Sequence, residues 1–332
     1  MKRQFTMLND ITGSREQSGA GEFARDVLRG LTSTPKRLSS KYFYDKRGSE
    51  LFSRIMELPE YYLTNAELEI LSTHGKLLAE LCRGESFDLI ELGAGDGRKT
   101  SVLLKQFVAQ HLEFEYVPID ISRSAVEQLT SRLLSELPSL NVNGLVTEYF
   151  SGMRWMNRSA TRKKIVLFLG SNIGNFTLAE AREFLSALRN TMKDGDLLIL
   201  GMDLEKDPEV LLAAYSDSQG VTREFNLNLL ERINRELGGN FTLENFEHCA
   251  RYNADCQAME SYLFSLKKQA VELSALSRSF TFGQGEPIHM EYSMKYSEDQ
   301  IEALAADSGF RITRNFFDSR RYFVDSVWEV AK

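Results

Sequence analysis

The stretch FDLIELGAGDGRKT, residues 87–100, joins a short apolar run to a glycine-rich turn and a basic segment. Glycines at 93, 95 and 97 let the chain turn tightly after a strand and let a ligand approach the backbone, while the helix expected next offers unpaired amide groups. The spacing G-x-G-x-G differs from the G-x-G-x-x-G of dinucleotide-binding turns. The stretch therefore predicts the first strand and ligand-binding turn of an α/β sheet without the usual dinucleotide fingerprint.

Further apolar runs alternate with helical patterns along the chain. A helical pattern begins near residue 64, with Thr64 or Asn65 as the expected N-cap. The apolar runs are continuous, as in strands buried on both faces, and predict an open parallel α/β sheet. The expected strands are FDLIEL (87–92), EYVPIDI (115–121), LVTEYF (145–150), KIVLFLG (164–170) and DLLILGMDL (196–204).

The end of the chain adds a more specific feature. FRITRNFFD (310–318) and YFVDSVWEV (322–330) are strand-like runs joined by a link too short for a crossover helix. They are expected to pair as an antiparallel hairpin. A Rossmann-like sheet that ends in an inserted antiparallel strand is typical of class I methyltransferases, by analogy at the level of fold.

A change of pattern between residues 205 and 295 predicts an inserted α+β substrate-binding or lid domain. Helical patterns at 208–218, 223–237 and 243–253 give way to strand-like ones at 258–273 and 286–296. The sheet then resumes. We expect a methyltransferase core of 65–204 and 296–332, a substrate-binding domain of 21–64 and 205–295, and a poorly ordered polar segment at 1–20.

Four side chains near the expected turn suggest a nucleoside site. Asp120 ends the second strand, where an acid can accept hydrogen bonds from two ribose hydroxyls. Lys99 could reach a ligand carboxylate, and Glu148 with Tyr149 could frame an adenine. The pattern (D/E)-x-G-x-G-x-G together with Asp120 indicates S-adenosylmethionine. The alternatives are a helix cap for Asp120, a solvated Lys99 and Glu148, and a core position for Tyr149.

The composition excludes several classes of protein. With 332 residues, 42% of them hydrophobic, the chain can bury a large core. The net charge is -7 and the basic residues are dispersed, so no nucleic acid is expected as a partner. Neither a signal peptide nor a membrane span is recognisable, which favours a cytoplasmic protein. The three cysteines and four histidines lack ligand spacing, so we expect no metal.

Several motifs together resemble a known family. They are FYD..GS.LF at 43–52, LPEYY at 58–62, ELG.G at 91–95, GS.IGN at 170–175, GVTREFNLNLLERINREL at 220–237 and E-x-S in MEYSMKY at 290–296. From about Pro35 to Lys332 the sequence resembles the histidine-specific N-alpha-methyltransferases of ergothioneine biosynthesis, which form hercynine and are related to dimethylallyltryptophan N-methyltransferases. The resemblance implies S-adenosylmethionine as methyl donor, a small amino acid as substrate, and no metal.

The resemblance also implies roles for individual residues. For the donor, Gly93, Lys99 and Asp120 match family contacts, and Glu148 with Tyr149 stands where the family more often has Asp-Phe. Tyr44 matches the methyl-transfer site. The residues that match the holders of the acceptor's α-amino and α-carboxylate groups are Tyr61, Asn175 and Tyr215, and those that match the imidazole-binding pair are Glu291 and Ser293.

The acceptor specificity depends on a strand near residue 291. Glu291 and Ser293 are two residues apart, so on a strand they face the same side and could converge on a ring with two nitrogens. The alternatives are an exposed polar strand face for this pair, a turn role for Asn175 and packing for Tyr61. Ser261 stands where family members commonly have Met beside the substrate ring, so another acceptor such as tryptophan stays open.

Three functions follow from these observations. The first is successive methylation of the α-amino nitrogen of L-histidine to N,N,N-trimethylhistidine (hercynine). The second is N-methylation of another amino acid, such as tryptophan or a derivative. The third is a non-catalytic protein that binds S-adenosylmethionine. No heptad or apolar patch marks an interface in the sequence, so a monomer or weak oligomer is expected.

Overall fold

The computed structural model describes residues 5–7, 17–158 and 162–331, which fall into two compact units. The first contains Tyr62–Glu205, the segment from Met294 onward and strand β1; the second contains Lys206–Ser293 and the segment that ends at Tyr61. These boundaries lie within a few residues of the expected ones. Within 1–20, strand β1 (Phe5–Met7) is formed and helix α2 begins at Gln17, while 1–4 and 8–16 lie outside the described residues.

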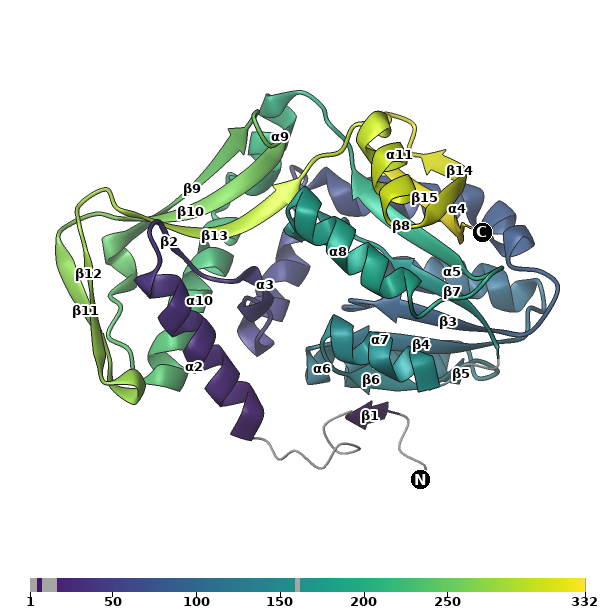
Figure 1. Ribbon diagram of the computed structural model, residues 1–332, viewed down its shortest axis with the longest axis horizontal. Coiled ribbons are helices and arrows are strands. Elements are labelled where there is room, and N and C mark those ends of the chain that lie inside the picture. The colour runs from purple at the N-terminus through teal and green to yellow at the C-terminus, as the bar shows by residue number, and fades with distance from the viewer. Residues whose placement is uncertain (1–4, 8–16, 159–161, 332) are drawn as a thin grey trace. The chain divides into compact units, whose positions relative to one another are not determined.

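The first unit is built on a mostly parallel sheet with the order β1-β6-β4-β3-β7-β8-β15-β14, in which β5 pairs with β4 (Figure 1). Only β15 runs against its neighbours, antiparallel to both β8 and β14. The predicted hairpin and the class I methyltransferase sheet are therefore confirmed. The strands are β3 (Phe87–Leu92), β4 (Phe114–Asp120), β5 (Asn141–Val142), β6 (Gly144–Val146), β7 (Lys163–Phe168), β8 (Leu197–Asp203), β14 (Phe310–Phe317) and β15 (Phe323–Val330).

Helices cover both faces of this sheet. The pair α4 and α5 packs together on one face, and α8 packs with α11 on the other (Figure 1). Every residue of β3 and β8 is buried, as their continuous apolar runs predict. The helices are α4 (Tyr62–Leu81), α5 (Arg98–Ala109), α6 (Arg123–Glu136), α7 (Tyr149–Arg158), α8 (Leu178–Arg189), α11 (Glu298–Asp307) and the 3-10 turn η2 (Asn172–Asn175).

The second unit has α+β architecture, as expected. Its four-stranded sheet has the order β2-β13-β10-β9, and β11 pairs with β12. Helices α9 and α10 pack against β9 and β10, and α3 packs against α10. The elements are α2 (Gln17–Thr32), β2 (Lys36–Arg37), η1 (Ser40–Tyr42), α3 (Lys46–Ile55), α9 (Pro208–Tyr215), α10 (Val221–Leu237), η3 (Leu243–Asn245), β9 (Phe246–Asn253), β10 (Ala258–Ser265), β11 (Gln269–Leu273), η4 (Ser274–Leu276), β12 (Arg278–Phe282) and β13 (Pro287–Met294).

Three local expectations are wrong. Helix α4 begins at Tyr62, so neither Thr64 nor Asn65 is its N-cap. The segment 243–253 was expected to be helical, but most of it forms β9, because pairing with β10 outweighs the local pattern. The strand expected at 145–150 ends at Val146, and Tyr149 begins helix α7. Short apolar runs fit a strand and a helical turn equally well.

Glu91, the acid of the ELGAGDG motif, connects structural elements next to the glycine turn. Glu91 is buried on β3, where its carboxylate accepts hydrogen bonds from Thr100 Oγ1 at 2.6 Å and from the Tyr116 hydroxyl. It thus links β3 to the first turn of α5 and to β4. Burial raises the pKa of Glu91 to about 7, although these hydrogen bonds oppose the shift.

Among the residues described, no helix is long and apolar enough to cross a membrane.

We expect the variant Glu91→Gln to unfold less easily than the wild type above neutral pH. The unfolded chain releases the Glu91 proton near pH 4.5, whereas the folded protein keeps it to about pH 7, so the free energy of unfolding falls across this interval. Glutamine at position 91 does not ionise, so the variant avoids about 2 to 3 kcal/mol of that loss in the free energy of unfolding. Urea unfolding at about pH 5 and pH 8 measures the difference between variant and wild type, with the exposed Glu113→Gln as control. An advantage that is the same at both pH values would contradict the buried acid.

Candidate functional site

The glycine turn after β3 is held by the neighbouring strand β4. The amide of Gly93 donates to Ile119 O at 2.8 Å, and the amide of Gly95 donates to Asp120 Oδ2 at 2.9 Å. Gly93, Gly95 and Gly97 all have positive φ angles, which only glycine adopts without strain. A Cβ at Gly95 would meet no atom within 4 Å, so the turn is open on that side. This open backbone fits the approach of a nucleoside ligand such as S-adenosylmethionine.

Asp120 lies at the carboxyl end of β4, directly beside the turn. Its Oδ1 accepts from the Ser122 amide at 2.8 Å while its Oδ2 accepts from Gly95, so two backbone amides fix the carboxylate. Burial raises the pKa of Asp120, and the backbone hydrogen bonds act against that rise. Its role toward a ribose stays a prediction. Ser122 also caps α6, the cap role that we considered for Asp120.

Tyr149 reaches the turn from the start of α7. A Cβ at Gly93 would lie 2.8 Å from both the Tyr149 hydroxyl oxygen and Asn172 Nδ2, so these two polar groups converge on residue 93. Burial raises the pKa of Tyr149 and keeps its hydroxyl protonated. Glu148 beside it is exposed. The sequence analysis did not single out Asn172, although it lies in the GSNIGN motif.

Lys99 has a protein partner that the sequence did not reveal. Its Nζ forms an ion pair with Glu67 of α4, a fully buried residue whose Oε1 also accepts from the Gly170 amide at 2.7 Å. Burial disfavours the charged lysine, but the Glu67 carboxylate outweighs this and raises the pKa of Lys99. Burial also raises the pKa of Asp325 on β15, and the charge of Glu67 adds to the shift. The contact of Lys99 with a donor carboxylate stays a prediction.

The predicted acceptor residues are divided between the units. In the second unit, Tyr215 of α9 and Ser293 of β13 meet, with 2.5 Å between their hydroxyl oxygens, and both are buried. Glu291 is half-buried on the same strand, and Ser261 is buried on β10. Asn175, at the end of η2, belongs to the first unit. The structure therefore brings together Tyr215 and Ser293, one predicted for the α-amino and α-carboxylate groups and the other for imidazole.

Two further predicted residues lie around one aromatic ring. The ring centroid of Phe52 in α3 is 5.5 Å from that of Tyr44 and 6.2 Å from that of Tyr61. Phe225 of α10 completes this aromatic cluster, with its centroid 5.7 Å from Tyr44 and 5.8 Å from Phe52. The faces of such rings attract cations. Tyr44 of the FYD motif and Tyr61 of the LPEYY motif thus both lie against one phenylalanine.

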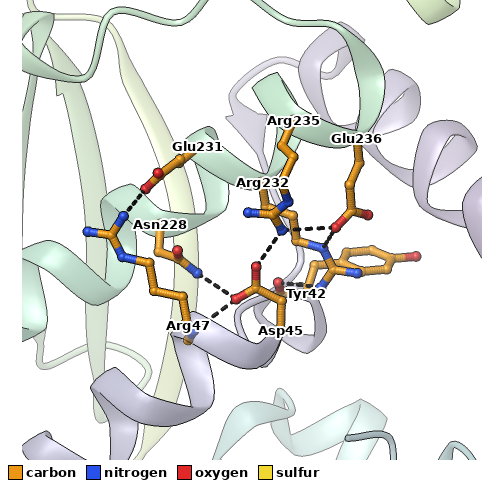
Figure 2. Close-up of polar contacts among 9 residues, drawn as sticks. Tyr42, Asp45, Arg47, Asn228, Glu231, Arg232, Arg235 and Glu236 are labelled. Carbon is orange, nitrogen blue, oxygen red and sulfur yellow. Dashed lines mark hydrogen bonds and ion pairs between the residues drawn. The ribbon is translucent and has the colours of Figure 1, made fainter. Parts of the chain in front are cut away.

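Asp45, which directly follows Tyr44, joins α3 to α10 (Figure 2). Its Oδ1 accepts from the Gly48 amide and from Asn228 Nδ2, both at 2.8 Å, and its Oδ2 accepts from Arg235 at 2.6 Å. Burial would raise the pKa of Asp45, but these hydrogen bonds outweigh it and lower the pKa. Arg47 makes an exposed pair with Glu231. The Asp45 contacts fix the backbone that carries Tyr44.

Comparison with known proteins gives consistent matches. The family described as "Histidine-specific methyltransferase, SAM-dependent" matches residues 23–330. Histidine N-alpha-methyltransferase of Mycolicibacterium smegmatis is 38% identical over 302 residues, covering 91% of this chain and 92% of that protein. The protein of the same name from Mycobacterium tuberculosis is 37% identical over 303 residues, covering 91% and 93%. Ergothioneine biosynthesis protein 1 of Neurospora crassa is 32% identical over 282 residues, covering 83% of this chain and 31% of that protein.

Replacing Asp45 tests the link between α3 and α10. We expect Asp45→Ala to lower the free energy of unfolding by about 2 kcal/mol, because it removes a helix cap, the acceptor of Asn228 Nδ2 and one of the two carboxylates that Arg235 contacts. Arg47→Ala, in the first turn of α3, serves as control and changes the free energy of unfolding by less than about 0.5 kcal/mol. Urea unfolding measures both values, and equal effects would contradict the role assigned to Asp45.

Proposed function

The chain belongs to the family of histidine-specific, S-adenosylmethionine-dependent methyltransferases, and we propose that it methylates the α-amino nitrogen of L-histidine successively, giving N,N,N-trimethylhistidine (hercynine). The observation that carries this proposal is the family match over residues 23–330, which includes segments of both units. The relatives named histidine N-alpha-methyltransferase match along nearly their whole length. One relative named for ergothioneine biosynthesis suggests that pathway as the context.

For the methyl donor, we propose the turn of Gly93 together with Asp120, Lys99, Glu148 and Tyr149. The fit of the turn is supported by its open side at Gly95 and by the carboxylate fixed beside it. S-adenosylmethionine, when bound, supplies an electrophilic methyl group on a sulfonium. Lys99 carries a positive charge that its pair with Glu67 stabilises, so it can orient an anionic group without a change of protonation.

For the acceptor, we propose that Tyr61, Asn175 and Tyr215 hold the α-amino and α-carboxylate groups, while Glu291 and Ser293 bind the imidazole. The contact between Tyr215 and Ser293 supports a shared role, since both hydroxyls can exchange hydrogen bonds with one ligand. A carboxylate and a hydroxyl suit an imidazole, which offers one donor and one acceptor. An indole offers one donor and no acceptor, so this pair favours histidine over tryptophan.

Methyl transfer requires that the amine of the acceptor be neutral and that its lone pair lie in line with the methyl group of the donor. Positioning supplies most of the rate, because an in-line displacement needs one geometry and no covalent help from the protein. The ammonium must first lose a proton, and desolvation lowers its pKa. We propose that Tyr44, or a water beside it, relays that proton from the amine toward solvent. The aromatic cluster of Tyr44, Tyr61, Phe52 and Phe225 can retain the methylated cation by attraction worth about 0.5 to 2 kcal/mol.

The decisive experiment presents the protein with S-adenosylmethionine and each amino acid in turn. We expect mass spectrometry to detect mono-, di- and trimethylated histidine, because a retained cation can undergo successive transfers. Methylation of tryptophan in place of histidine would favour the second function. The absence of methylation with every amino acid would contradict both enzymatic functions and leave a protein that binds the donor without turnover.

The Glu291 side chain provides a test of acceptor recognition. We expect Glu291→Ala to raise the KM for histidine about 10- to 100-fold, the effect of losing a hydrogen bond to a charged group, and to change the donor Kd less than about twofold. Glu247→Ala, an exposed carboxylate on β9 of the same sheet, is the matched control. Equal loss of donor and acceptor affinity in Glu291→Ala would count against imidazole binding at this position.

We further propose that the protein acts on a small molecule in the cytoplasm as a monomer or weak oligomer, without a nucleic-acid or membrane partner. The dispersed charge and the net value of -7 support the absence of nucleic acid. Measurement of the molar mass in solution tests the oligomeric state.

A further inference from the structure

Within residues 17–158 and 162–331, the chain passes between the two units at three places, 61/62, 205/206 and 293/294. Within the first unit, one buried polar side chain stands close to each passage: Tyr62, Asp203 and Lys295. We refer to these three residues as the crossing cluster. They come from α4, β8 and the segment after β13, which are far apart in the sequence. No role in donor or acceptor binding was assigned to any of them above.

The carboxylate of Asp203 is the centre of the crossing cluster. Its Oδ2 lies 2.8 Å from Lys295 Nζ, and the Tyr62 hydroxyl lies 2.9 Å from Oδ1 and 2.7 Å from Oδ2. The exposed fraction of the residue is 0% for Asp203, 0% for Lys295 and 4% for Tyr62. The buried Asp203 carboxylate therefore joins the end of β8 to Tyr62 and Lys295, which follow the passages at 61/62 and 293/294.

Backbone hydrogen bonds extend the crossing cluster to neighbouring segments. Asp203 O accepts from the Tyr296 amide at 2.9 Å, and the Glu205 amide donates to Tyr296 O at 3.0 Å. The amide of Asp203 donates to Ser171 Oγ at 3.1 Å, and the Tyr296 hydroxyl donates to Ile173 O at 3.2 Å. Ser171 and Ile173 belong to the GSNIGN turn that ends in Asn175. The crossing cluster is thus continuous with the turn that carries this proposed acceptor residue.

A buried ion pair is a weak source of stability, since the desolvation of both charges offsets their attraction. Its geometry is nevertheless strongly restricted, because displacement of either partner would leave a buried charge unpaired. Two proposed acceptor residues adjoin the crossing cluster: Tyr61 directly precedes Tyr62, and Ser293 stands two residues before Lys295. Fixed covalent dimensions limit how far such neighbours can move relative to an anchored residue. Restriction of the anchors therefore restricts the acceptor-binding side chains.

We infer that Tyr62, Asp203 and Lys295 are positioning residues for the amino-acid acceptor, which act by fixing the chain beside Tyr61 and Ser293 and next to the turn that ends in Asn175. In its reference to the acceptor, this inference rests on the proposed function. The methyl donor depends on the turn after β3, to which the crossing cluster contributes no residue. The cluster reaches the donor side only through the backbone of the GSNIGN turn, whereas Tyr61 and Ser293 are its direct neighbours in the chain, so loss of one side-chain contact is expected to weaken acceptor binding more than donor binding.

The test uses variants of the full chain that remove one contact at a time. Tyr62→Phe deletes a single hydroxyl and keeps the ion pair, so it is the variant least disturbing to folding. Asp203→Asn removes the charge opposite Lys295. The matched control is Tyr116→Phe, which deletes the hydroxyl of another buried tyrosine that donates to a carboxylate in the same unit, remote in sequence from the three passages. Thermal unfolding records the stability of each variant.

Calorimetry with histidine in the presence of S-adenosylhomocysteine gives the acceptor Kd without turnover. For Tyr62→Phe we expect a histidine Kd raised about tenfold and an S-adenosylhomocysteine Kd within about twofold of the wild type. Hydrogen exchange is expected to accelerate together at Asp203–Glu205 and Met294–Tyr296. The control variant is expected to lose stability with neither effect. Unchanged histidine affinity in Tyr62→Phe, or equal weakening of both ligands, would overturn the inference.

The proposed function and this inference fail in different ways. A wild-type protein that neither binds nor methylates histidine contradicts the proposed function. In that case hydrogen exchange still tests whether the crossing cluster anchors the chain. Joint acceleration of exchange at Asp203–Glu205 and Met294–Tyr296 supports the anchoring role. No acceleration in either Tyr62→Phe or Asp203→Asn overturns that role.

Discussion

The close approach of several elements to the turn after β3 is possible because residues 93 and 97 have no Cβ. Tyr149 and Asn172 converge on Gly93, and the side chain of Leu129 lies where a Cβ of Gly97 would stand. All three glycines of the turn also have positive φ angles. Residues 93 and 97 therefore need both a positive φ angle and the absence of a side chain, which only glycine provides without strain. The strand, the following helix and the turns after β6 and β7 depend on this constraint for their arrangement around one backbone segment.

Buried carboxylates connect these elements beneath the turn. Glu91 joins β3 to α5 and β4, Glu67 joins α4 to Lys99 and the Gly170 turn, and Asp203 joins β8 to Tyr62 and Lys295. Each has partners of defined geometry, because a buried carboxylate without them would be costly. The contribution of such groups lies more in geometry than in stability. This fits a protein whose proposed reaction depends on positioning two small molecules, with no dedicated base apparent among the residues proposed to act.

In the proposal, the first unit carries the donor turn and Asn175, and the second unit carries the other acceptor residues. The parallel sheet supplies the donor turn, as the order of its strands indicates. The second unit supplies an aromatic cluster, whose ring faces attract cations, and a pair of hydroxyls. In the proposal, side chains on β10 and β13 decide which acceptor is bound. Ser261 and Glu291 are the positions where that choice is expected to be visible.

The sequence by itself determined the parallel sheet, the terminal hairpin, the inserted α+β unit and the family. Continuous apolar runs, a link too short for a crossover and motifs of fixed spacing are local properties of the chain. It misjudged the end of the 145–150 segment, because a short apolar run fits a strand and a helical turn equally well, and the 243–253 segment, because pairing with β10 outweighs the local pattern. Only the tertiary structure decided that Lys99 pairs with Glu67, that Tyr215 meets Ser293 and that Asp203 joins Tyr62 to Lys295. Such partners are distant in sequence, and burial, which gives these contacts their strength, is a property of the folded chain.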